Sequence, residues 1–394
     1  MKTDVLPALL LSAVLATAAP LAAARAEDPG VTKDSIKIGM FGPITGPASV
    51  FSKSLLGAEA IYKDINDHGG INGRKIKLSV EDDGCDPNKG IAAVKKLVAQ
   101  DQVFLVHGGW CSNVVMAVLP QLGSGDKAVP FMDLGAASSA ISSPSKPNVY
   151  QPVATADAVT KTMVEFGLSK PGAKRFAIIS HSDEWGKSHL EGSLNALKAH
   201  GLAPVESVAF ERGATDATSQ ILRLRQAKPD VVLAVLYPAE LAIFLRDSRK
   251  YGLHTVTLGT QAVSVEDTAQ RVGNPEAVKN LYVFYPLSAP LDSPQFAKWA
   301  DIFKKYNPGE IIDTISFISM SGSLAVAEAI RRMGPDVTRD GLIRQLNSLK
   351  DFDPGIQSAP LTFTADQHAG IASGKMAHLL NGKVVVLDSY PAGS

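Results

Sequence analysis

Two successive runs of alternating strand-like and helix-like segments constrain the fold of this chain more than any other feature. The first run has short apolar strands at residues 36–42, 75–80, 103–106 and 129–132, with helical periodicity at 52–68, 87–100 and 112–122. The alternation restarts at Asp157, with helices at 157–168, 186–200, 217–227 and 239–251 and strands at 175–180, 203–210, 230–236 and 256–258. Several strands are wholly apolar, as a parallel sheet buried on both faces requires. The pattern predicts an α/β protein with two doubly wound α/β lobes.

The last part of the chain adds a strand, three helices and a hairpin. The strand is expected at residues 281–285, and the helices at 295–306, 313–332 and 338–349. Two further strands, at 376–380 and 383–388, flank Asn381-Gly382, which is a strong signal for a two-residue hairpin turn.

Length and composition exclude several classes of protein. The 394 residues exceed the roughly 250–300 that one hydrophobic core supports, which also indicates two domains. Lysine plus arginine and aspartate plus glutamate both number 39, so no broad nucleic-acid surface is expected. The hydrophobic fraction of 45% argues against disorder, and two cysteines exclude a disulfide-dense or Cys-rich metal protein. A binding protein for a small molecule, or an enzyme, remains.

The N-terminus predicts a cleaved secretory signal at residues 1–26. Lys2 precedes an apolar stretch, residues 5–24, which ends at an A-x-A site, Ala24-Arg25-Ala26. A membrane anchor is the alternative, but Pro7 and Pro20 interrupt the stretch, which barely reaches the ~20 residues of a span. No cysteine stands at the cleavage site, so no bacterial lipid anchor is expected.

The loops after the strands are the expected binding region, because ligands of open α/β sheets sit beyond the carboxyl ends of the strands. These loops are residues 42–54, 107–112, 133–139, 181–186, 236–240 and 259–264. Four aromatic residues fall in them, and each could instead be a core or rim residue: Phe51, Trp110, Trp185 and Tyr237.

A Gly-Gly-Trp-Cys-Ser segment joins a strand end to a helix start. Gly108 and Gly109 let the backbone approach a ligand closely, and Ser112 offers a hydroxyl at the helix N-terminus, where free N–H groups attract an anion. A carboxylate group of a ligand is the anion expected there. The alternative is that Ser112 is an ordinary helix N-cap.

Cys85 and Cys111 each follow a strand end in the same half of the chain, and in a secreted protein they predict one disulfide. A catalytic thiol is the alternative.

No sequence motif of a zinc protease, a serine hydrolase or a phosphate-binding loop occurs, so no catalytic residue, metal or cofactor is predicted. Asp82, Asp83 and Asp86 could hold a cation, but a solvated turn is favoured.

Five segments resemble one family of transport proteins. They are Phe41-Gly42-Pro43-Ile44-Thr45-Gly46-Pro47, Gly57-Ala58-Glu59, Asn66-Asp67-His68-Gly69-Gly70-Ile71-Asn72-Gly73, Glu81-Asp82-Asp83-Gly84-Cys85-Asp86-Pro87 and Cys111-Ser112. Over essentially the whole mature chain, the sequence resembles the periplasmic substrate-binding proteins of branched-chain (hydrophobic) amino acid ABC transporters, of the leucine/isoleucine/valine-binding type.

The resemblance implies a type I periplasmic binding fold, with two α/β lobes joined by three crossovers. Lobe 1 would comprise residues 34–153 and 287–364, and lobe 2 residues 154–286 and 365–391, with the ligand cleft between them. It also implies a periplasmic monomer that delivers a small molecule to an inner-membrane permease with a cytoplasmic ATPase, without a cofactor and without nucleic acid.

The resemblance carries ligand-binding roles to particular residues. Ser112 matches the serine that binds the ligand carboxylate, and a small-residue turn that includes Ala136, Ala137 and Ser138 completes that site. Phe51 stands where an aromatic residue closes the first-lobe side, Trp185 replaces a tyrosine of the second lobe, and Tyr237 matches a second-lobe tyrosine.

One position departs from the family pattern. The amino-acid binders carry a glutamate facing the ligand ammonium, and Gln261 stands there in this chain. A buried ammonium without a carboxylate partner costs on the order of several kcal/mol, so we hypothesise an acid or amide ligand without an ammonium, and first an aromatic acid. Glu184 or Glu240 could replace the missing charge. A branched-chain amino acid binder, an amide-sensing receptor domain and a secreted enzyme are the alternatives.

Overall fold

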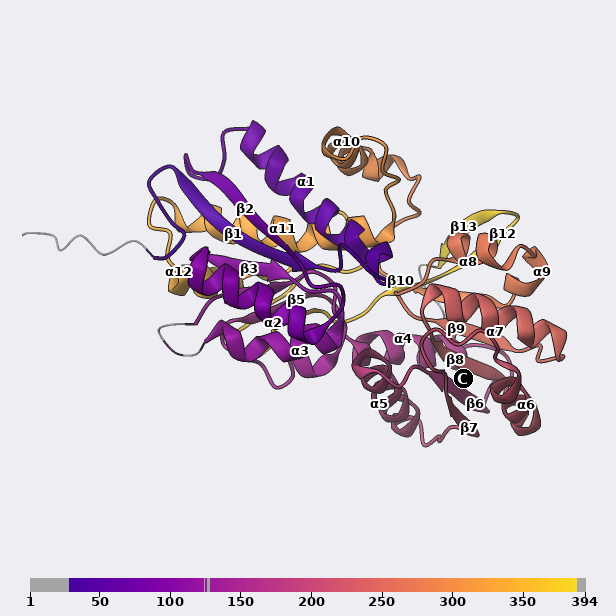
Figure 1. The fold of residues 1–394 in the computed structure, drawn as a ribbon. Coiled ribbons are helices and arrows are strands. Elements are labelled where there is room, and N and C mark those ends of the chain that lie inside the picture. Colours follow the sequence, from indigo (N-terminus) through magenta and orange to yellow (C-terminus); the bar gives the residue numbers. More distant parts are fainter. Residues whose placement is uncertain (1–27, 124, 126–127, 388–394) are drawn as a thin grey trace, which may run out of the picture.

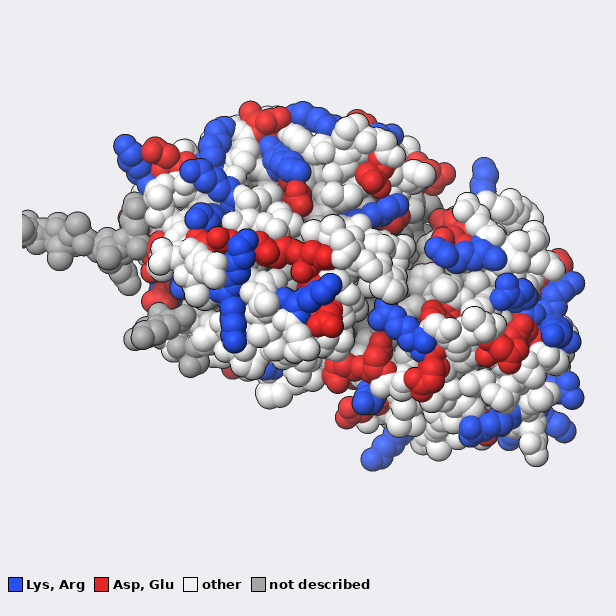
Figure 2. Space-filling model, viewed as in Figure 1, with Lys and Arg blue, Asp and Glu red and all other residues white. Residues whose placement is uncertain are grey.

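The computed structural model describes residues 28–123, 125 and 128–387, so the predicted signal segment at 1–26 lies outside the described residues. Two sheets form two lobes that lie side by side (Figure 1). On the face drawn in Figure 2, basic and acidic side chains are interspersed, in keeping with the balanced composition.

The first lobe is built on a six-stranded sheet in which every pair of neighbouring strands is parallel. Its order is β11 (Ala369–Ile371), β5 (Val149–Ala154), β4 (Phe131–Asp133), β3 (Leu105–Gly108), β1 (Ser35–Gly42) and β2 (Lys75–Asp82). One face packs on α1 (Lys53–Asp67), α11 (Thr314–Met333) and α12 (Arg339–Asn347). The other face packs on α2 (Pro87–Lys95) and α3 (Ser112–Val118). Helix α10 (Ala297–Tyr306) packs beside α1.

The second lobe is built on a seven-stranded sheet. Five parallel strands run in the order β10 (Leu281–Tyr285), β9 (Val256–Gly259), β8 (Val231–Val235), β6 (Phe176–Ser180) and β7 (Glu206–Ala209). The antiparallel hairpin of β12 (Lys375–Leu380) and β13 (Lys383–Leu387) completes the sheet beside β10. The hairpin turn is the predicted one, with positive φ at Asn381 (53°) and Gly382 (77°).

Alternating side chains of the second sheet face two layers of helices. Phe176 and Ile178 point into the core formed with α4 (Ala156–Leu168) and α5 (Glu184–Ala199). Ala177 and Ile179 point to the opposite core, whose helices are α6 (Thr218–Ala227), α7 (Pro238–Lys250) and α8 (Val265–Val272). Both faces of the centre of the sheet are therefore buried, which is why the central strand β8, Val-Val-Leu-Ala-Val, is wholly apolar.

The chain passes between the sheets three times, after β5, after β10 and between β11 and β12. The sequence-based boundary between residues 364 and 365 is wrong for β11, because Ala369 pairs with Gln151 of β5 in the first sheet. The third crossover is therefore confined to residues 372–374. Three-residue strands carry no alternation pattern, so only the long-range pairing assigns β11 to its sheet.

Two predicted features differ locally from the structure. The expected helix at 87–100 ends as α2 at Lys95 and continues as one wide turn, Lys96–Gln100. Helices α8 and α9 (Pro275–Val278) lie where no helix is predicted. Asn274 caps α9 through Glu276 N, and Ser264 caps α8 through Asp267 N, so short capping signals mark both helices.

Candidate ligand-binding site

A small cavity lies between the lobes, beyond the carboxyl ends of the parallel strands. Its first-lobe lining is Trp110, Ser112 and Gly135, and its second-lobe lining is Trp185, Tyr237, Gln261 and Ala262. Five residues proposed from sequence therefore line one cavity, although they span 152 positions of the chain, from Trp110 to Gln261. The cavity measures about 20 Å³, which is room for about one water molecule.

The other proposed residues lie close behind this lining. Phe51 stacks on Trp110, and Ala137 packs with Trp185 and Val235 in a small apolar cluster. Ser138 contacts Ser112. Ala136 is buried in the first-lobe core and does not line the cavity.

Aromatic rings form two walls of the cavity. Phe51 and Trp110 of the first lobe are nearly parallel, with centroids 5.4 Å apart. Trp185 and Tyr237 of the second lobe are stacked at 4.5 Å. The Phe51 and Tyr237 rings, 6.1 Å apart, join the two walls across the cleft. Flat apolar surfaces of this kind suit a planar apolar group, because ring stacking adds to the gain from burial.

Ser112 is the first residue of α3, and its hydroxyl makes no capping bond. Cys111 occupies the N-cap position, so the alternative of an ordinary N-cap serine is wrong. The Ser112 hydroxyl instead accepts a hydrogen bond from the backbone N–H of Ser138 at 3.2 Å. Its own proton remains available to an acceptor, such as a ligand carboxylate.

Hydrogen bonds from the side chain of Gln151 on β5 stabilise the turn that follows β4. The Gln151 amide donates to the carbonyl oxygens of Ala136 (2.8 Å) and Ser138 (3.1 Å) and accepts from Ser142. Within this turn, a Cβ on Gly135 would lie 2.2 Å from Cζ3 of Trp110. Only glycine therefore allows the Trp110 ring to lie against this turn.

Asp183 holds the second-lobe wall together. Its Oδ1 atom accepts from Gly186 N at 2.8 Å, which caps α5, and Oδ2 accepts from the Tyr237 hydroxyl at 3.0 Å. Because Trp185 lies in the first turn of α5, one carboxylate orients both rings of the stack. Burial raises the pKa of Tyr237, and the adjacent Asp183 charge adds to the effect, so the phenol stays protonated.

Two buried histidines lie behind Trp185. The Nδ1 atom of His189 donates to the Trp185 carbonyl at 2.8 Å, and burial lowers the pKa of His189 to about 4. His189 is therefore neutral at pH 7. Burial also lowers the pKa of His181, whose ring lies 4.7 Å from that of Tyr237. The Gln261 side chain interacts with His189, and this interaction opposes part of the effect of burial on the pKa of His189.

Polar contacts join the lobes at two places. The Ser138 hydroxyl donates to Glu184 (3.0 Å), and Ser139 N donates to the Ser188 hydroxyl (3.0 Å). Between other loops, Arg212 Nη1 lies 3.9 Å from Cys85 Sγ. Neither Arg212 nor Asp183 is among the residues proposed from sequence. Arg212 lies in the loop after β7, which is not one of the six loops expected to bind a ligand, whereas Asp183 lies in the expected loop 181–186.

Cys85 and Cys111 form a disulfide, which excludes the alternative of a catalytic thiol. The neighbouring acids are engaged by their own loops. Asp86 caps α2, and Asp83 Oδ1 accepts from Cys85 N at 2.7 Å, while burial raises the pKa of Asp83 to about 6. Asp82 is partly desolvated, but hydrogen bonds from Thr45, Gly84 and Ile44 lower its pKa to about 2. Among the described residues no group of three or more potential metal ligands is placed to hold an ion.

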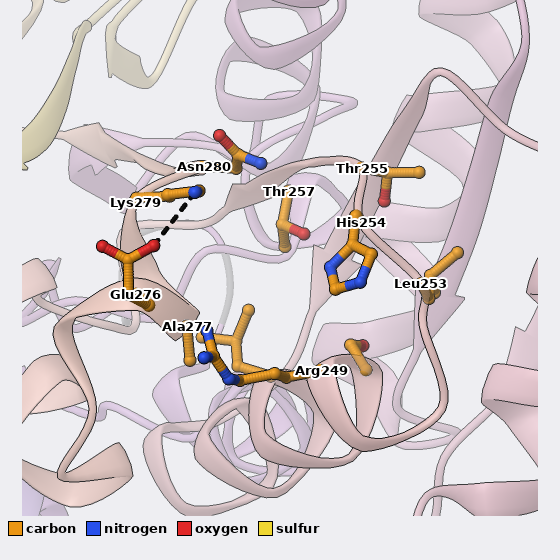
Figure 3. A pocket seen from close by; sticks show the side chains of 11 residues that line it. Arg249, Leu253, His254, Thr255, Thr257, Glu276, Ala277, Lys279 and Asn280 are labelled. Carbon is orange, nitrogen blue, oxygen red and sulfur yellow. Dashed lines mark hydrogen bonds and ion pairs between the residues drawn. The ribbon is translucent and has the colours of Figure 1, made fainter.

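A larger cavity, about 320 Å³, lies in the second lobe away from the cleft (Figure 3). The residues that line it come from the end of α7, the segment leading into β9, and α9 with the residues after it. In Figure 3, Glu276 and Lys279 form an ion pair (3.0 Å) at its edge, with Arg249 and His254 nearby. It opens near the start of β9, at the opposite end from the loop that carries Gln261. Because ligands of open α/β sheets sit beyond the carboxyl ends of the strands, the smaller, inter-lobe cavity is the better candidate for a ligand site.

Among the described helices, none is both long and apolar enough to cross a membrane. Two doubly wound lobes that meet at the carboxyl ends of their strands, with a cavity between them, define a two-lobed binding protein. Residues 35–383 match the model of the periplasmic binding proteins, and the chain belongs to this family. The predicted type I periplasmic binding fold is therefore confirmed, and the family is one of substrate-binding transport proteins of the ABC-transporter type.

Several proteins of this kind are similar to the chain over nearly its whole length. A Leu/Ile/Val-binding protein homolog from Brucella suis is 27% identical over 376 residues, 92% of this chain and 90% of the relative. The substrate-binding protein LivJ of a branched-chain amino acid transporter from Streptococcus pneumoniae, solved with isoleucine, has a TM-score of 0.77 and 19% identity, and the match covers 90% of this chain and 99% of LivJ. A fatty acid ABC transporter substrate-binding protein from Thermomonospora curvata has a TM-score of 0.79 and 22% identity, with 93% and 98% covered.

Proposed function

We propose that this chain is the extracytoplasmic binding component of an ABC importer, and that it captures a small carboxylate- or amide-bearing ligand between its lobes. The observation that carries the proposal is the inter-lobe cavity, in which the Ser112 hydroxyl, two aromatic walls and the neutral Gln261 converge. The protein would be a periplasmic monomer that hands its ligand to an inner-membrane permease with a cytoplasmic ATPase.

An aromatic acid is the favoured ligand. Trp110, Trp185 and Tyr237 offer ring surfaces to the cavity, with Phe51 stacked behind Trp110, and Ser112 offers a donor to a carboxylate. Gln261 supplies no negative charge for an ammonium, and leaving an ammonium unpaired would cost several kcal/mol, on the order estimated for buried charges. One protein of the same fold is a fatty acid ABC transporter substrate-binding protein. It supports the proposal that the ligand of this chain is an acid without an ammonium group.

A branched-chain amino acid is the second candidate, and one specific observation favours it. Asp183 and Glu240 both act electrostatically on the Tyr237 hydroxyl, so negative charge lies near the cavity although Gln261 is neutral. Asp183 accepts from Tyr237, and Glu240 accepts from Gly213 N at 2.9 Å. The relatives described as Leu/Ile/Val-binding proteins support the same candidate. A receptor domain that senses an amide would use the same cleft.

Capture requires the lobes to separate. The cavity of about 20 Å³ is far smaller than a benzoate-sized molecule, so Phe51 and Tyr237, which meet across the cleft, must move apart. In this mechanism the ligand first binds the first lobe through Ser112 and the Ala136–Ser138 turn. The second lobe then closes with Trp185, Tyr237 and Gln261, which shifts a hinge equilibrium toward the closed form.

Isothermal titration of the purified protein with benzoate, benzamide and leucine tests the proposed ligand class. We expect benzoate or a substituted benzoate to bind and leucine to bind at least about 100-fold more weakly, since an unpaired buried ammonium costs several kcal/mol. Nanomolar-to-micromolar binding of leucine, with no binding of the aromatic acids, would reject the aromatic acid and leave the amino acid.

Replacing Ser112 by alanine is expected to weaken acid binding by about 1–3 kcal/mol, roughly 5- to 150-fold, because a hydrogen bond to a charged group is lost. Titration calorimetry measures the change. Ser348→Ala is the matched control, since this first-lobe serine bonds to the carbonyl oxygen of Gln345 at the end of α12 (2.9 Å) and does not line the cavity. Unchanged affinity in Ser112→Ala would mean that the hydroxyl serves only its contact with Ser138 N.

A further inference from the structure

Arg212 is a cation at the second-lobe rim of the cavity. Its guanidinium lies over the Tyr237 ring, 5.0 Å from the centroid, and Nη1 lies 3.9 Å from Cys85 Sγ of the first lobe. Tyr237 itself lines the cavity and stacks on Trp185. Arg212 therefore touches both a ligand-facing ring and the opposite lobe.

The surroundings of Arg212 are acidic. Asp183, Glu211 and Glu240 all act on the His181 ring, and Arg212 is the cation that opposes them. Each of these carboxylates is already hydrogen-bonded elsewhere: Asp183 to Tyr237, Glu211 to the Ser182 hydroxyl at 2.9 Å and Glu240 to Gly213 N at 2.9 Å. Without Arg212, this rim would repel an anionic ligand.

Among the described residues, no carboxylate forms an ion pair with the guanidinium of Arg212 at 4.0 Å or less. The Arg212 side chain donates to the disulfide sulfur of Cys85, which is a weak acceptor. A carboxylate that arrived near Tyr237 would therefore gain a charge-assisted hydrogen bond from the guanidinium at little loss.

We propose that Arg212 determines the charge of the ligand that this site accepts: it favours an anion over a molecule that bears an ammonium, and its contact with Cys85 places the guanidinium over the cleft when the lobes close. This inference rests on the proposed function, because it concerns the same cavity. Arg212 acts as a specificity-determining residue. Its guanidinium packs on the ring of Tyr237, which lines the cavity, so its charge lies close to the binding surface.

The test compares acids with their neutral amides in wild type, Arg212→Gln and Arg212→Lys, using calorimetry with benzoate, benzamide and leucine. The matched control is Arg223→Gln, because Arg223 is an exposed arginine of the same lobe whose ion pair with Glu206 (2.9 Å) lies within that lobe. In Arg212→Gln we expect benzoate binding to weaken about tenfold or more and benzamide binding to change by less than about twofold. Arg212→Lys should restore part of the benzoate affinity, and Arg223→Gln should match wild type.

The outcomes separate this inference from the proposed function. Equal weakening of benzoate and benzamide in Arg212→Gln would assign Arg212 a purely structural role and overturn the inference. A wild-type protein that binds no acid more tightly than its amide overturns it too, while leucine binding in that protein would still support a solute-binding function. Leucine affinity that rises in Arg212→Gln would support the charge role of Arg212. A protein that binds none of the three compounds rejects both.

Discussion

Replacing Cys85 and Cys111 together by serine is expected to lower the free energy of unfolding by about 3–4 kcal/mol. The disulfide joins residues 26 positions apart, and in the chain-entropy model a cross-link over such a loop removes this much conformational freedom from the unfolded chain. The bond ties the loop after β2 to the residue before Ser112, so ligand binding should weaken as well. Urea unfolding at pH 7, followed by tryptophan fluorescence, measures the stability change.

Reductant provides the control for this prediction. Dithiothreitol should destabilise the wild-type protein by a similar amount and leave the double-serine variant unchanged, because both cysteines of the described chain are in this one bond. A loss below about 1 kcal/mol in the variant would mean that the unfolded chain is already restricted near this loop, and that the chain-entropy model does not apply.

Replacing Trp185 by alanine is expected to weaken ligand binding by about 30- to 150-fold, since removal of a central aromatic anchor costs on the order of 2–3 kcal/mol. Trp185 is 6% exposed, stacks on Tyr237 and packs on Ala137 of the opposite lobe. Its loss therefore removes one wall of the cavity and a contact that closes the lobes. Calorimetry with the ligand that the wild type binds measures the effect.

Two further variants make the Trp185 result specific. Trp185→Phe keeps a ring in the wall and should retain most of the affinity, which guards against a simple folding defect in the alanine variant. Trp299→Ala removes a partly buried tryptophan of α10, outside the cavity lining, and should leave binding unchanged. If Trp185→Ala binds as tightly as wild type while remaining folded, the aromatic wall does not contact the ligand.

Most of the candidate site could be predicted because strand ends are visible in sequence. Trp185, Tyr237 and Gln261 are far apart in the chain, but each follows an apolar strand, and the carboxyl ends of parallel strands meet at one edge. The cysteine pairing was predictable for a similar reason, since a secreted chain with two cysteines offers one bond. The role of each residue toward a ligand stays a proposal.

Other features depend on partners that no local pattern reveals. Gln151 supports the turn after β4 only because β5 lies beside it, and Asp183 reaches Tyr237 across two strand-end loops. Arg212 of the second lobe contacts Cys85 of the first lobe, and the two residues are 127 positions apart in the chain. Each of these contacts is made by a polar side chain whose partner is distant in sequence, whereas periodicity reports only on the burial of a residue's own segment.

The sequence by itself determined the class of fold and the strand ends beside which the inter-lobe cavity lies, because apolar periodicity and strand–loop–helix order are local properties that burial enforces. The tertiary structure alone decided that β11 joins the first sheet and that Ser112 receives a backbone N–H instead of capping its helix. It also decided that the aromatic walls leave only a small cavity. These features arise from packing between segments far apart in the chain, where small differences in distance decide which partner each polar group finds.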